Sequence, residues 1–76
     1  MKIEIYGSGC SKCKKTEEIV RQVVSELNIK AEISKIEDLQ KIIDKGIMMT
    51  PAVAIDGEIK ILGRVPTTQD VKKILQ

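Results

Sequence analysis

Gly7-Ser8-Gly9-Cys10-Ser11-Lys12-Cys13 is the stretch around which the rest of the 76-residue chain is organised. It holds both cysteines of the chain, between an apolar alternation and a long helical pattern. At such a strand-to-helix junction, the sulfurs of a Cys-x-x-Cys lie close enough to form a disulfide or bind a soft metal. The helix N-terminus favours a thiolate through its unpaired N–H groups and partial positive charge. We therefore expect Cys10 to be the reactive cysteine.

The sequence on either side of this stretch predicts different positions for the two cysteines. Residues 2–6 alternate and predict a strand, and apolar residues at helical spacing predict a helix over residues 11–27. Cys13 falls on the inward stripe of that helix, whereas Cys10 lies ahead of its first turn, at an exposed tip. This asymmetry assigns the attack to Cys10 and the resolving step to Cys13.

The remainder of the chain predicts one more strand-helix unit, a hairpin and a final helix. Residues 30–34 predict a strand, and Ser34 and Glu37 have the form of a capping box that opens a short helix ending near Gly46. Two apolar runs joined by Asp56-Gly57 predict a β-hairpin, and a last helix opens at residue 67. The order is βαβαββα. It predicts parallel first strands, an antiparallel hairpin and helices on both faces of a four-stranded mixed sheet.

Composition narrows the class of protein. The length fits one domain over residues 1–76, and 13 basic against 11 acidic residues with one aromatic side chain disfavour nucleic-acid binding. No signal-peptide pattern or membrane-length apolar run is present, so we expect a cytoplasmic protein that is not membrane-bound. A disulfide across so short a loop stabilises by only roughly 2 kcal/mol. Chemistry therefore explains the cysteine pair better than stapling.

Three interpretations of the pair remain open from the residues alone: redox chemistry, half of a metal site, or incidental cysteines. With no histidine and no third cysteine, a closed tetrahedral zinc site would need two chains. A Cu(I) chaperone could use just the two thiolates. Lys12, Lys14 and Lys15 are either a solvated basic face or a group that stabilises a Cys10 thiolate and lowers its pKa.

Further motifs give the whole chain a resemblance to a known group. Met49-Thr50-Pro51-Ala52, the Ile55-Asp56-Gly57 hairpin and Gly63-Arg64-Val65-Pro66 follow the cysteine stretch in order. The chain resembles small thioredoxin/glutaredoxin-like redox-active disulfide proteins of bacteria and archaea. This resemblance implies the thioredoxin-like α/β fold, a βαβαββα chain whose four-stranded mixed sheet is flanked by three helices. It also implies a cis bond before Pro51, with the proline facing the cysteine pair.

The resemblance implies a protein disulfide oxidoreductase that reduces protein or small-molecule disulfides. It implies Cys10 as nucleophile and Cys13 as the resolving residue, with the Cys10-Cys13 disulfide as the redox group and neither a cofactor nor a metal. The residues expected near the substrate are Thr50, Pro51, Gly9, Ser11 and Lys12. The expected partners are disulfide-containing proteins and an upstream reductase, and we expect a monomer.

Departures from the family pattern limit what the resemblance implies. Gly9 stands where thioredoxins commonly carry tryptophan, and Ser11-Lys12 stands where they carry Gly-Pro. Gly63-Arg64 replaces a glycine pair typical of glutathione binding, so glutathione dependence is not expected. Beside an oxidoreductase and a Cu(I) chaperone, a third possible function is an interaction or redox-sensing domain with Lys12 and Arg64 in a docking rim.

Overall fold

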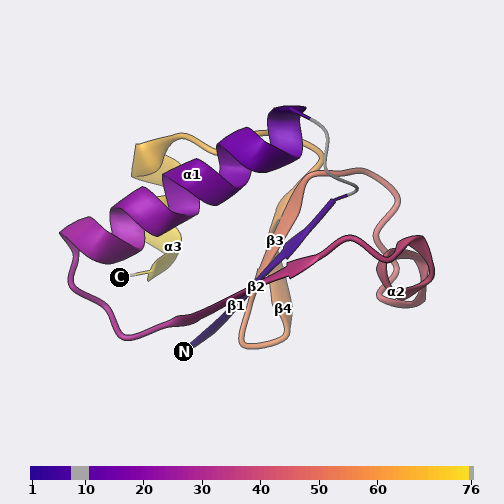
Figure 1. Cartoon of the computed structure of the whole chain (residues 1–76), viewed down its shortest axis with the longest axis horizontal. Helices are drawn as coiled ribbons and strands as arrows, with labels where there is room; N and C mark the ends of the chain where they lie inside the picture. The colour runs from indigo at the N-terminus through magenta and orange to yellow at the C-terminus, as the bar shows by residue number, and fades with distance from the viewer. Residues whose placement is uncertain (8–10, 76) are drawn as a thin grey trace.

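The computed structural model describes residues 1–7 and 11–75 and orders the chain as βαβαββα (Figure 1). The elements are β1 (Lys2–Tyr6), α1 (Ser11–Glu26), β2 (Glu32–Ile36), α2 (Leu39–Asp44), β3 (Ala52–Ile55), β4 (Glu58–Leu62) and α3 (Thr68–Leu75). This order confirms the one predicted from the sequence. No helix in the described ranges is both long enough and apolar enough to cross a membrane.

The four strands form one mixed sheet in the order β2-β1-β3-β4. β1 pairs in parallel with β2 and antiparallel with β3, which in turn pairs antiparallel with β4. A strand-helix-strand crossover produces the parallel pair, and the hairpin produces the last antiparallel pair. The predicted mixed sheet is therefore confirmed, with β1 in an interior position.

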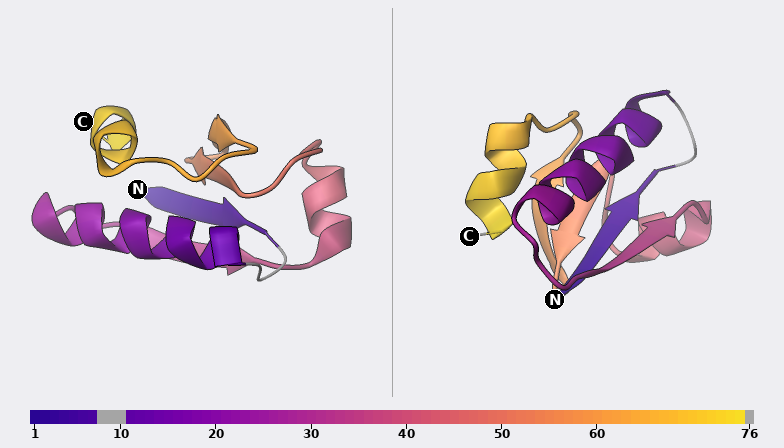
Figure 2. Two further views of the ribbon diagram at one scale, coloured as in Figure 1. Left: turned by 90° about the horizontal axis from the view of Figure 1, so that it is seen from above. Right: turned by 60° about the vertical axis from the view of Figure 1, so that its left-hand side comes forward.

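Helices cover both faces of the sheet, as predicted (Figure 2). Ile3 and Ile5 of β1 face the larger core, where α1 and α3 pack against the sheet. Tyr6, one position on, points to the opposite face and packs in a smaller cluster with Ile42 of α2. Because successive side chains of a strand point to opposite faces of the sheet, β1 contributes side chains to both cores.

Two turns have a direct local cause. α1 is followed by Asn28 at φ 52°, where the amides of Asn28 and Ile29 donate to the carbonyls of Ser25 and Val24. These two hydrogen bonds form a Schellman motif, which ends the helix. Asp56 and Gly57 both have positive φ, as a two-residue hairpin turn requires, so the predicted hairpin is confirmed.

The predictions for β2 and α2 were partly wrong. β2 spans Glu32–Ile36 instead of residues 30–34, and α2 begins after Asp38, whose carboxylate accepts a hydrogen bond from the Gln40 amide at 2.9 Å. Ser34 therefore lies inside a strand and opens no helix. The cause is non-local: β2 pairs with β1 along its whole length, and the Gly7 amide extends this by donating to the Ile36 carbonyl.

Candidate redox site

Three strand ends and one helix start meet at one end of the sheet. β1 leads into Gly7, β3 follows Pro51, and β4 ends before Gly63. The register places these ends side by side, since Tyr6 pairs with Ala52 and Ala52 pairs with Leu62. Beyond these pairs, the Gly63 amide donates to the Pro51 carbonyl at 2.9 Å.

Cys13 lies in the first turn of α1 and packs against the end of β1. Its side chain is completely buried, which confirms the predicted inward position. A Cβ atom added at Gly7 would overlap the Cys13 Sγ and lie 3.0 Å from the Cys13 Cβ. Only glycine leaves room for the sulfur at this point, so Gly7 fixes how closely the thiol approaches the sheet.

Thr50 and Pro51 occupy the loop in front of β3. Thr50 is exposed and Pro51 is buried, and the peptide bond between them is cis, the isomer expected from the family resemblance. The loop is supported from β4, because a Cβ atom at Gly63 would lie 2.9 to 3.4 Å from three side-chain atoms of Met49. Gly63 also has a φ of +74°, so this position requires glycine for two reasons.

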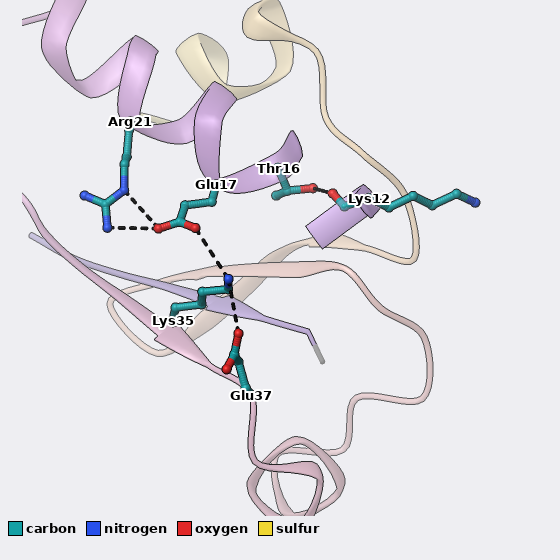
Figure 3. A network of polar contacts seen from close by, with 6 residues as sticks. All are labelled: Lys12, Thr16, Glu17, Arg21, Lys35 and Glu37. Atoms are coloured by element: carbon teal, nitrogen blue, oxygen red, sulfur yellow. Dashed lines mark hydrogen bonds and ion pairs between the residues drawn. The ribbon is translucent and has the colours of Figure 1, made fainter. Parts of the chain in front are cut away.

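Thr16 is a buried polar residue that the sequence analysis did not single out. Its side chain is completely buried one turn after Cys13, and its Oγ1 donates to the Lys12 carbonyl at 2.9 Å (Figure 3). A threonine hydroxyl bonded to the carbonyl four residues earlier satisfies its own donor within the helix. The bond joins Thr16 to the residue immediately before Cys13. Its sequence signal is a hydroxyl residue on the same helical face as Cys13, three positions on.

The basic residues near the start of α1 differ from Arg64 in whether they are paired with a carboxylate. Lys12, Lys14 and Lys15 are exposed, and none of them forms an ion pair within the described part of the chain. Arg64, also considered for a docking rim, is bonded to Asp70 at 2.7 Å. This hydrogen bond is the main cause that lowers the pKa of Asp70 from 3.8 to about 2, and hydrogen bonds from the amide and hydroxyl of Thr67 contribute less.

An ion-pair network further along α1 joins this helix to β2 and to Glu37 (Figure 3). Lys35 of β2 lies 3.1 Å from Glu37 and 3.6 Å from Glu17, and Arg21 lies 3.0 Å from the same Glu17. The hydrogen bond to Glu37 is the main cause that raises the pKa of Lys35, with further contributions from both carboxylates. Glu17, the acidic residue of α1 that is closest in sequence to the three lysines, is therefore already paired with other residues.

The structure brings together some of the predicted site residues. Ser11 and Lys12 are exposed in the first turn of α1, and buried Cys13 lies at the same end of the sheet as Pro51. The predictions for Gly9 and Cys10 lie outside the described residues. The sequence analysis missed Gly7 as a contact of Cys13; its only signal was a glycine directly after a strand.

A separate pocket of about 370 Å³ lies on the α2 face of the sheet. Its lining residues are Glu4, Tyr6, Ile36, Lys41, Asp44 and Lys45. Burial, followed by the nearby Glu4 carboxylate, raises the pKa of Tyr6, so the phenol stays protonated at neutral pH. The pocket is on the other side of the sheet from α1, which carries Cys13.

Fold and site together define a thioredoxin-like α/β protein, and comparison with known sequences gives the family. The sequence profile described as thioredoxin domain matches residues 1–76. The chain is 47% identical to a thioredoxin of Methanothermobacter thermautotrophicus over 99% of this chain and 97% of that protein. It is 40% identical to a thioredoxin of Methanocaldococcus jannaschii over 97% and 85% of the two chains. The chain belongs to the thioredoxin domain family and is a thioredoxin-like redox protein.

The copper-carrier interpretation receives no support from these findings. The observed order βαβαββα differs from the order βαββαβ, ending in a strand, of small ferredoxin-like metal carriers with a Cys-x-x-Cys after their first strand.

Proposed function

We propose that the protein is a thiol-disulfide oxidoreductase that uses Cys10 and Cys13 to reduce disulfides in proteins or small molecules. The Cys10 thiolate attacks one sulfur of the substrate disulfide. A mixed disulfide forms, and the other substrate sulfur leaves as a thiolate. The Cys13 sulfur, having lost its proton, then attacks Cys10 and releases the second substrate thiolate. The two released thiolates take up protons, and the protein is left with a Cys10-Cys13 disulfide.

The observation that carries the proposal is the burial of Cys13 in the first turn of α1, with its sulfur held against Gly7. A resolving cysteine must reach its neighbour two residues earlier and stay protected from outside reagents, and this position provides the protection. The family membership of the whole chain supports the same chemistry.

The proposal extends to partners and location. Disulfide-containing proteins serve as substrates, and an upstream reductase returns Cys10 and Cys13 to the dithiol form. The protein works as a cytoplasmic monomer, and its only redox group is the Cys10-Cys13 pair. Thr50, Pro51, Gly9, Ser11 and Lys12 contact the substrate.

Trapping the mixed disulfide tests the mechanism. Cys13→Ser removes the resolving thiol, so a peptide disulfide should leave one peptide chain attached to Cys10, detected as added mass in intact-protein mass spectrometry. Cys10→Ser is the matched control, because it keeps the buried thiol and should form little adduct. Equal adduct on both variants, or none on Cys13→Ser, would contradict the assigned roles.

A further inference from the structure

The start of α1 carries positive charge that does not stabilise the fold. Lys12, Lys14 and Lys15 lie within its first five residues, its first turn has no acidic residue, and the ion pairs of residues 1–7 and 11–75 leave all three lysines out. Positive side chains near a helix N-terminus oppose the helix dipole. Their placement therefore works against helix stability and leaves three charges directed to solvent beside Cys13.

Exposed apolar side chains lie at the same end of the molecule. Met48 is 87% exposed and Met49 is 57% exposed, directly before Thr50 and Pro51. Met49 packs over Gly63, whose amide bonds the Pro51 carbonyl. Methionine adapts its shape to a partner, so this pair offers a deformable apolar contact.

The basic and apolar groups are connected through the redox site. Cys13 contacts Gly7, and Tyr6, which precedes Gly7, pairs with Ala52. Pro51 directly precedes Ala52. On the other flank the positive charge of Arg64 is already paired with Asp70. The unpaired positive charge therefore lies on the α1 side of the site, and the methionines lie on the β3 and β4 side.

We propose that this surface docks protein substrates whose disulfide lies between acidic residues and an apolar side chain. The acidic residues would face Lys12, Lys14 and Lys15, and the apolar side chain would contact Met48 and Met49. This inference rests on the proposed function and names its substrate class. Complementary charge chiefly raises the rate of encounter, by about tenfold or more at low ionic strength, and salt screens it.

Two synthetic peptide disulfides test the charge requirement. They share the disulfide and one leucine, and differ only in carrying three glutamates or three serines on one side. The reduced protein should react with the acidic peptide about tenfold faster at low salt, and the ratio should approach one at 0.5 M salt. Using the ratio cancels any change in the intrinsic reactivity of Cys10.

Two matched triple variants locate the charge requirement. The test variant combines Lys12→Gln, Lys14→Gln and Lys15→Gln. The control variant combines Lys30→Gln, Lys41→Gln and Lys73→Gln. Both sets remove three exposed lysines that lack ion pairs within the described ranges. The first set should reduce the rate ratio to near one, and the second should preserve it. An equal ratio in both sets, or a ratio of one in the native protein, would overturn the charge assignment.

A Met48→Gln variant tests the apolar half. Replacing the leucine of the acidic peptide by serine should lower the rate at which the native protein reduces it about threefold. The same replacement should leave the rate of the variant unchanged. An identical slowing in both proteins would overturn the methionine contact. If neither peptide is reduced at all, the proposed function fails and this inference fails with it; if both are reduced at one rate, only this inference fails.

Discussion

The starts of α1 and α3 are built in opposite ways. At α3, the Thr67 hydroxyl accepts from the Asp70 amide at 3.1 Å, and the Asp70 carboxylate accepts from the Thr67 amide at 3.0 Å. The carboxylate also binds Arg64. At α1, the first turn carries no acidic residue, and Lys12, Lys14 and Lys15 oppose the helix dipole.

The difference indicates what each helix start does. The reciprocal bonds at α3 satisfy backbone donors that a helix start otherwise leaves open, so they serve the fold. At the start of α1, the three lysines oppose the helix dipole and present positive charge beside the cysteine stretch. Substitutions at α3 should therefore change stability alone, whereas substitutions around Cys13 should change the chemistry as well.

The largest effect is expected at Gly7. Gly7→Ala places a Cβ atom on the Cys13 sulfur, so the thiol or the strand end must move. We expect a loss of about 1 to 3 kcal/mol in the free energy of unfolding, measured with urea. We also expect the release of substrate by Cys13 to slow by on the order of tenfold or more, measured by rapid quenching, because the attacking sulfur is displaced.

Gly57→Ala is the control for this variant. Gly57 has a φ of +87° in the hairpin turn with open space around it, so alanine there costs about 1 kcal/mol through backbone strain. It lies far from Cys13 in the sheet and should leave the resolving step unchanged. Slowing of that step in Gly57→Ala, or an unchanged rate in Gly7→Ala, would contradict the role given to Gly7.

A smaller effect is expected at the cap of α3. Thr67→Ala removes the hydroxyl that accepts from the Asp70 amide and should lower the free energy of unfolding by about 1 kcal/mol. Chemical denaturation measures this loss. The rate of disulfide reduction should match that of the native protein, and a clear drop in rate would end the separation between the two helix starts.

The smallest effect depends on pH. Folding lowers the pKa of Asp70 from 3.8 to about 2, chiefly through the hydrogen bond from Arg64. A lowered carboxyl pKa stabilises the folded state above pH 3.8, and this contribution is lost as the pH falls from about 4 to about 2. Asp70→Asn should therefore unfold at a lower temperature than the native protein at pH 7, and the difference should shrink toward pH 2. A constant difference across that range would contradict the pKa assignment.

Local signals predicted those parts of the fold that depend on local chemistry. The alternation of residues 2–6, the helical spacing of α1 and the Asp56-Gly57 turn each led to the observed element. The capping-box form at Ser34 failed because pairing with β1 extends β2 to Ile36. A local motif cannot reveal that a distant strand competes for the same residues.

The same limit applies to the faces of α2 and to the site. Helical spacing would place Leu39, Ile42 and Ile43 on one apolar stripe, yet Leu39 and Ile43 are 65% and 53% exposed and only Ile42 of the six-residue α2 is buried. The inward position of Cys13 followed from helical spacing. Its contact with Gly7 did not, because that contact depends on how α1 lies against the sheet.

Equilibration of the native protein in graded dithiothreitol buffers without metal tests the central claim most directly, with thiols trapped by alkylation and counted by mass spectrometry. The account predicts that Cys10 and Cys13 oxidise together in one two-electron transition, at a potential between about −200 and −280 mV. Failure to form an intramolecular disulfide, or a potential well below about −300 mV, would contradict a catalytic pair.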